Sequence, residues 1–234
     1  MDGRFSRNEM LLGDTAGLRS RHVAVIGLGG VGSWCADALA RSGIGRLTLV
    51  DFDTISLSNI NRQLCARTST VGMPKAIVMR DWALEINPDI QAVALVEKYE
   101  AGFFDKYGGF DYIIDAIDLV SYKVDLIKTA KALEIPIISA LGTGNKLNPE
   151  LLRVADIAET ESCAFARVVR RELRRAGVLS HTVVYSPEPA IVPAPAAETP
   201  PPGRRSIPGS VPWVPASAGL LLASYVVRDL LGDF

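Results

Sequence analysis

The sequence has few cysteines, and their spacing excludes a structural zinc site. Cys35, Cys65 and Cys163 are the only three among 234 residues. A structural zinc site takes four ligands, commonly two C-x-x-C pairs, which these cysteines cannot supply. An odd and scattered set, with no signal peptide before it, is typical of free thiols in a reducing compartment, so we expect a cytoplasmic protein.

Long hydrophobic runs and an excess of one charge are also missing. The most apolar stretch, 218–227, ends at Arg228 and is well short of the roughly 20 residues that span a membrane. We expect a helix in the core or in a dimer interface there, and no stable membrane insertion. With 25 basic and 26 acidic residues, the chain as a whole has no general attraction for nucleic acid.

What is present begins with a glycine-rich turn. The apolar run 22–26 (HVAVI) predicts a buried strand, and helical spacing follows from residue 34. The turn between them reads GLGGVG, and such a strand-to-helix turn lets phosphates approach the backbone and the helix N-terminus. Asp51 ends the next apolar run, about 20 residues on, where an acid suits the hydroxyls of a ribose. These residues predict a nucleotide site; the alternative is a tight turn without a ligand.

Two cations after this acid favour ATP over a dinucleotide. Arg62 and Lys75 follow shortly, beside the polar segment 58–63 (SNINRQ). NAD has no need of them, whereas ATP concentrates negative charge on its β- and γ-phosphates. Asp115 and Asp118 end a later apolar run, at the sheet edge where ligands bind in open α/β folds, and a carboxylate there suits Mg²⁺ bound through water. We expect ATP and Mg²⁺, with surface ion pairs as the alternative.

Apolar runs and helical spacing alternate along the chain. They predict strands over 22–27, 46–51, 91–96, 110–115 and 135–140, and helices over 30–42, 73–86, 119–134, 162–176 and about 216–231. The alternation predicts an α/β fold with a doubly wound, mostly parallel, Rossmann-like sheet and a C-terminal helical and loop extension. The segment 187–215, dense in Pro and Ala, predicts a long mobile loop, so 1–234 is expected to form a single ATP-binding, adenylyltransferase-like domain.

Together these motifs resemble the ThiF/MoeB/HesA superfamily, the adenylyltransferases related to ubiquitin-activating enzymes. The match covers about 4–142 and implies binding of MgATP and adenylation of a carboxylate. It also implies a homodimer in which Arg7, from the segment RFSR, reaches the ATP of the partner subunit. The catalytic residues implied are Arg7, Arg62, Lys75 and Asp118. The nucleotide contacts predicted from the motifs and the resemblance are Gly27, Gly29, Gly30, Gly32, Asp51, Asp53, Asn59, Arg62, Gln63, Lys75 and Asp118.

Later segments resemble one subgroup, the tRNA threonylcarbamoyladenosine dehydratases. DAID at 115–118, GTG at 142–144 and VADIAET at 154–160 extend the match to about Gly177, although Ala164-Phe165 replaces a common Pro-Leu. The resemblance implies that ATP activates the threonyl carboxylate of the modified tRNA, whose own carbamoyl group then closes a ring and releases AMP. Two alternatives stay open: an adenylyltransferase for a ubiquitin-like sulfur carrier, and a dinucleotide oxidoreductase or non-catalytic nucleotide-binding module. Sulfur-relay partners such as a cysteine desulfurase are also left open.

An arginine-rich helix is the evidence for tRNA that comes from the residues themselves. Helical spacing places five arginines on one face, and we expect this face to lack balancing acids and to contact phosphates. Glu172 falls on the apolar side, where it caps or pairs locally. A merely solvated helix is the alternative. The five residues are Arg167, Arg170, Arg171, Arg174 and Arg175, and Arg204 and Arg205 extend the patch.

The remaining candidates are expected to be structural. His22 and His181 flank strands, and a lone histidine there is usually a satisfied polar group. Cys163 has no neighbouring His or Lys in the sequence to lower its pKa, which argues against a nucleophile. No general base is predicted.

Overall fold

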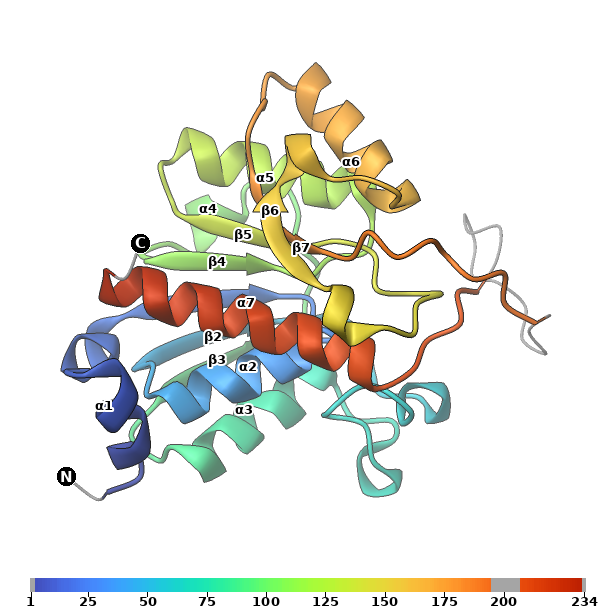
Figure 1. Ribbon diagram of the computed structural model, residues 1–234. Helices are drawn as coiled ribbons and strands as arrows, with labels where there is room; N and C mark the ends of the chain where they lie inside the picture. Colours follow the sequence, from blue (N-terminus) through green and yellow to red (C-terminus); the bar gives the residue numbers. More distant parts are fainter. Residues whose placement is uncertain (1–2, 195–206, 233–234) are drawn as a thin grey trace.

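The computed structural model describes residues 3–194 and 207–232, and it contains one seven-stranded sheet with the strand order β3-β2-β1-β4-β5-β7-β6 (Figure 1). Neighbouring strands are parallel except for β6 against β7. The strands are β1 (His22–Ile26), β2 (Arg46–Val50), β3 (Gln91–Leu95), β4 (Tyr112–Asp115), β5 (Ile137–Ala140), β6 (Arg153–Asp156) and β7 (Thr182–Tyr185).

Helices cover both faces of this sheet. One core cluster joins α2, α3 and α7 to the sheet, and a second joins α4, α5 and α6 to it from the opposite face (Figure 1). The predicted doubly wound, mostly parallel α/β fold is therefore confirmed. The helices are α1 (Ser6–Leu12), α2 (Gly32–Ser42), α3 (Lys75–Ile86), α4 (Phe103–Lys106), α5 (Val120–Ala132), α6 (Ala164–Arg175) and α7 (Trp213–Leu231).

The strand order has a topological switch point between β1 and β4. The chain runs outward from β1 to β3 on one side and from β4 onward on the other, so connections diverge between β1 and β4. In open α/β sheets, ligands bind outside the carboxyl ends of the strands at such a point. The glycine turn follows β1 and the DAID segment follows β4, so both motifs lie at this edge.

Some elements were not predicted. The edge strand β6 and the short helices α1 and α4 are additions, and α7 begins at Trp213, earlier than expected. The predicted loop 187–215 therefore ends in a helix. Its middle, 195–206, lies outside the described residues, and so do Arg204 and Arg205 of the predicted patch.

The expectation that no segment reaches membrane-spanning length is wrong for α7. Among the described residues this one helix is long and apolar enough to cross a membrane by length and composition. Its residues Ala218, Leu222 and Val226 are nevertheless fully buried in the core. A Cβ on Gly219 would meet the Val31 carbonyl oxygen at 2.4 Å, so α7 lies directly against the start of α2. These contacts agree with the predicted core helix.

Candidate ATP site and arginine-rich face

Glycine occurs at different positions of the turn for different physical reasons. Gly27 has φ +92°, and a Cβ there would lie 2.8 Å from the Ala116 carbonyl oxygen. A Cβ on Gly32 would lie 1.8 Å from the Gly27 oxygen, so the fold itself requires these two glycines. At Gly29, in contrast, the nearest described atom to a Cβ would be Gln63 Nε2 at 3.9 Å. No protein contact therefore requires glycine at position 29, and this open backbone fits the approach of a phosphate.

Asp51 is fixed at the end of β2 and faces the glycine turn. Its Oδ2 accepts a hydrogen bond from the Leu28 N–H at 2.7 Å, and its Oδ1 accepts one from the Asp53 N–H at 2.8 Å. The side chain is buried, and desolvation raises the pKa of Asp51, although Lys75 and the two N–H groups oppose the shift. The carboxylate is thus oriented before any ligand binds, as ribose recognition requires.

Lys75 is the first residue of α3 and is brought to the same edge by the backbone. Its N–H donates to the Asp53 carbonyl at 3.0 Å, and Thr54 forms an isolated bridge with Pro74. Its ammonium lies 2.9 Å from Asp53 Oδ2, and only 6% of its side chain is exposed. Asp53 therefore orients the lysine. A buried, oriented cation of this kind suits a phosphate group.

The loop after β2 brings Arg62 against the glycine turn. A Cβ on Gly30 would lie 3.4 Å from Arg62 Cγ. The guanidinium donates to the Ser58 carbonyl and to Asn61 Oδ1, and Trp34 Nε1 donates to the Arg62 carbonyl at 3.1 Å. Asn59 Oδ1 accepts the Ser56 N–H at 3.1 Å, so this predicted nucleotide contact also shapes its own loop.

The two acids of the DAID segment separate in the structure. Asp115 is fully buried, and its Oδ2 accepts from Lys123 Nζ and Ser139 Oγ, each at 2.6 Å. The expectation that Asp115 faces a ligand is therefore wrong, because internal donors surround its carboxylate. Asp118 is exposed, two residues beyond the Ala116 carbonyl that lies against Gly27. The described residues contain no group of three or more His, Cys, Asp or Glu that would hold a metal ion without help from a ligand.

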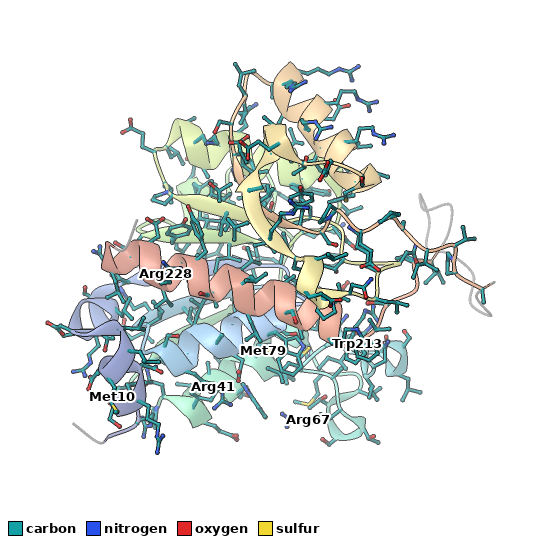
Figure 2. The ribbon with its side chains drawn as sticks, viewed as in Figure 1. Met10, Arg41, Arg67, Met79, Trp213 and Arg228 are labelled. Atoms are coloured by element: carbon teal, nitrogen blue, oxygen red, sulfur yellow. The ribbon has the colours of Figure 1, made fainter. Side chains whose placement is uncertain are left out.

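Arg7 is not brought to the glycine turn of its own chain. It is exposed on α1, which lies at the far end of α2: the Phe5 ring faces Gly43, and Asn8 Nδ2 donates to the Arg41 carbonyl at 2.8 Å. The glycine turn is at the other end of this eleven-residue helix, about 16 Å away. In Figure 2, Met10 and Arg41 lie toward one end of the molecule and Trp213 toward the other.

The arginine face on α6 differs from the unpaired stripe that we predicted. Arg171 Nε lies 2.8 Å from Glu172, and Arg175 lies 3.1 Å from it, so an acid does balance this face. These two cations lower the pKa of Glu172. Arg170 turns inward and donates to the carbonyls of Ile157 and Thr160 and to the Thr160 hydroxyl.

Arg167 and Arg174 are the two arginines that match the expectation of an exposed, unbalanced positive face. Both are exposed and have no hydrogen-bond or ion-pair partner among the described residues. The five arginines line a shallow surface hollow of about 460 Å³, and Figure 2 shows long side chains on the outer face of α6. The packed side of α6 contains Ala166, Val169 and Leu173.

The described end of the predicted mobile loop, 207–213, is held at the carboxyl edge of the sheet by hydrogen bonds. Gly209 exchanges two hydrogen bonds with Asn145, each at 2.7 Å. Asn61 Nδ2 donates to the Ser210 carbonyl at 2.9 Å, and Trp213 Nε1 donates to the Leu147 carbonyl at 2.7 Å. Residues 207–213 therefore link the Arg62 loop to the loop after β5. The one sequence feature that could have indicated this contact is Trp213, whose indole follows a proline-rich stretch.

The residues expected to be structural make the following contacts. His22 bonds the Gly109 carbonyl at 3.0 Å and Thr48 Oγ1 at 2.9 Å. Cys163 is buried, and its sulfur accepts the Ala166 N–H at the start of α6. His181 is 1% exposed and its Nε2 bonds Ser139 Oγ, but its buried Nδ1 has no hydrogen-bond partner among the described residues, so this histidine is only half satisfied.

Comparison with known proteins identifies the family. The model of the ThiF family matches residues 5–233. The chain belongs to the ThiF family. The tRNA threonylcarbamoyladenosine dehydratase of Bacillus subtilis (strain 168) is 42% identical over 245 residues, which cover 98% of this chain and 95% of that protein. The protein of the same name from Escherichia coli (strain K12) is 37% identical over 175 residues, covering 73% and 65%. The crystal structure of the E. coli dehydratase TcdA in complex with ATP has a TM-score of 0.87 at 31% identity, covering 98% of this chain and 94% of that one.

Proposed function

We propose that the chain is an ATP-dependent tRNA threonylcarbamoyladenosine dehydratase. The reaction cyclises threonylcarbamoyl-adenosine in tRNA by adenylating its threonyl carboxylate, with AMP and pyrophosphate as the other products. The observation that carries this proposal is similarity along nearly the whole chain to dehydratases of that name, one of which has been crystallised with ATP. The meeting of the glycine turn, Asp51, Lys75 and Arg62 at one sheet edge supports it.

The residues of this edge divide the adenylation between them. The backbone at Gly29 and Gly30 receives phosphate oxygens, and Asp51 binds the ribose hydroxyls. The substrate carboxylate attacks the α-phosphorus of ATP, and pyrophosphate leaves as its charge is stabilised by Arg62 and Lys75. Preorganised charges of this kind are worth most in the transition state, because they need no reorganisation as charge develops.

The second half of the reaction is intramolecular. The carbamoyl group of the same substrate attacks the activated carbonyl, the ring closes, and AMP leaves. Positioning within one molecule replaces the encounter of two reactants and lowers the barrier substantially. Asp118 is the exposed acid that would hold Mg²⁺ through water, and the ion would supply further charge neutralisation at the phosphates.

A homodimer completes this site in the proposal. Arg7 is separated from the glycine turn of its own chain by the length of α2, and it has no partner among the described residues. The helix α1 that carries it buries none of its side chains. A second copy placing its α1 beside the glycine turn would supply the missing cation. We place the enzyme in the cytoplasm and assign the chain to a single domain.

The proposed tRNA surface is the arginine face of α6, led by Arg167 and Arg174. The other function considered is an adenylyltransferase for a ubiquitin-like sulfur carrier, against which the lack of C-x-x-C pairs argues. The test is pyrophosphate release with three acceptors in parallel: tRNA bearing threonylcarbamoyl-adenosine, the same tRNA without the modification, and a sulfur-carrier protein. The proposal predicts pyrophosphate only with the first, and pyrophosphate only with the carrier would replace it with the alternative.

A further inference from the structure

A fully buried chain of polar side chains lies beneath the Asp118 turn. Lys123 of α5 and Asp115 at the end of β4 are both 0% exposed and form a salt bridge of 2.6 Å. Ser139 of β5 donates to the same Asp115 oxygen at 2.6 Å, and its hydroxyl is 2.8 Å from His181 Nε2. β4, β5 and β7 are consecutive in the sheet, His181 directly precedes β7, and α5 packs on β4 and β5 (Figure 1).

The donors and acceptors that join these side chains have one consistent arrangement, which leaves the buried His181 Nδ1 without a hydrogen-bond partner among the described residues. An ionised carboxylate only accepts, so the single Ser139 proton points to Asp115. The Ser139 oxygen then accepts the Nε2 proton of His181, which fixes the tautomer of a neutral imidazole. Burial agrees with this arrangement, because desolvation lowers the pKa of His181 to about 3.

One end of the chain is bonded to the Asp118 turn, and the residue at the other end is held through its main-chain groups. The Asp115 Oδ1 accepts the Ile117 N–H at 3.0 Å, one residue before Asp118. At the other end, the His181 N–H donates to Asp156 Oδ2 at 3.0 Å, and its carbonyl accepts the Ile157 N–H at 2.8 Å. The buried chain therefore connects three strands and one helix to the turn that carries Asp118.

Burying a lysine and an aspartate is costly unless each is paired, and pairs of this kind are weak evidence of a gain in stability. The chain does, however, determine where the Asp115 carboxylate sits, and through the Ile117 N–H it determines the course of residues 116–118. The Ala116 carbonyl in that turn also lies against Gly27. A shift of the turn would therefore move Asp118 relative to the glycine turn.

We infer that Lys123, Asp115, Ser139 and His181 form a positioning network that holds Asp118 in register with the glycine turn. The inference rests on the proposed function, because it assigns the network to the adenylation step. None of the four side chains touches substrate in this proposal. Their effect is on the geometry of the Asp118 turn, so loss of the network should lower turnover and leave ATP affinity nearly unchanged.

The chain offers a matched control for a test at Ser139. Thr48 of β2 makes the same kind of bond, hydroxyl to histidine Nε2, at 2.9 Å to His22, and it is 5% exposed. Thr48 has no contact with Asp115 and lies two strands away. Thr48→Val therefore removes a buried hydroxyl without affecting the Asp118 turn, and Ser139→Ala removes one that supports it.

The experiment measures AMP release by the full-length enzyme on ATP and tRNA bearing threonylcarbamoyl-adenosine. For Ser139→Ala we expect kcat to fall about 10-fold or more, the scale for small misplacements in an active site, with KM for ATP within about two-fold of wild type. Thr48→Val should keep kcat within about two-fold at a similar melting temperature, and Ser139→Thr should restore most of the turnover. Amide hydrogen exchange of 112–119 should rise in Ser139→Ala and not in Thr48→Val.

Equal turnover in Ser139→Ala and Thr48→Val would overturn the inference, as would unchanged exchange in 112–119. If Ser139→Ala melts below the assay temperature, Ser139→Cys takes its place, because a thiol is a weak donor of similar volume, and the same comparison applies. A wild-type protein that releases no AMP on this tRNA contradicts the proposed function instead. The exchange measurement then still decides whether the network holds the turn.

Discussion

Two arginines on α6 should account for a measurable part of the salt dependence of tRNA binding. Arg167 and Arg174 are exposed and have no partner among the described residues, and the five arginines with Glu172 give this face a net charge of +4, from five cations and one anion. Each phosphate that a cation neutralises contributes about 0.7 to 0.9 to the slope of log affinity against log salt. Replacing both arginines with alanine should therefore make the slope shallower by up to about 1.4 to 1.8.

The assay is tRNA binding by fluorescence anisotropy at several salt concentrations. Arg170→Met is the control, because its guanidinium already bonds the Ile157 and Thr160 carbonyls. This variant should lower the melting temperature and keep the salt slope, whereas the double variant should melt like wild type. A double variant with the wild-type slope would show that Arg167 and Arg174 do not neutralise tRNA phosphates, and an Arg170→Met variant that loses as much slope would show that the effect is not specific to these two residues.

Three further outcomes follow from the site and the core. Arg62→Ala and Lys75→Ala should each lower AMP release by about 100-fold or more, the scale for losing one preorganised donor, and activity within a few-fold of wild type in both would remove them from the site. Mixing Arg7→Ala subunits with Lys75→Ala subunits should restore partial activity through one intact hybrid site, whereas mixtures no more active than either parent would exclude sharing. The free energy of unfolding should fall as pH drops from about 6.5 toward 3, because His181 is protonated in the unfolded chain but not in the folded one. In the folded protein, burial together with Lys131 and Lys123 lowers the pKa of His181 to about 3, although Asp156 opposes the shift. Chemical denaturation at each pH measures this fall, which should be smaller in His181→Gln; identical curves would exclude His181 as the cause.

The parts of the fold that could be predicted depend on short stretches of sequence. The glycine turn, Asp51 and the later cations occur in the order of their elements, and parallel strands bring such segments to one edge. The glycines also differ in whether the fold requires them, because a Cβ at Gly27 or Gly32 would collide with backbone atoms and a Cβ at Gly29 would not. Sequence spacing alone does not separate these causes.

The wrong predictions concern side chains whose exposure and partners are determined by tertiary contacts. Asp115 and Asp118 belong to one short motif, yet only Asp118 is exposed, because Lys123 and Ser139 from separate elements meet Asp115. On α6, a helical projection gives the position of each Cα and not the reach of a long side chain. Glu172 projects from the apolar side and still reaches Arg171 and Arg175.

The position of the segment 207–213 was beyond prediction for a similar reason. Its hydrogen bonds to Asn61, Asn145 and Leu147 join positions far apart in the chain, and no local pattern announces them. A proline-rich composition indicates only that regular helices and strands are disfavoured.

The proposed dehydratase activity is tested by mass spectrometry of tRNA nucleosides after incubation with the protein, ATP and Mg²⁺. The substrate is tRNA that carries threonylcarbamoyl-adenosine, and a reaction without ATP is the control. The expected product is a nucleoside lighter by one water, formed only with ATP and in step with AMP. An unchanged nucleoside in the presence of ATP and active, folded protein would contradict it.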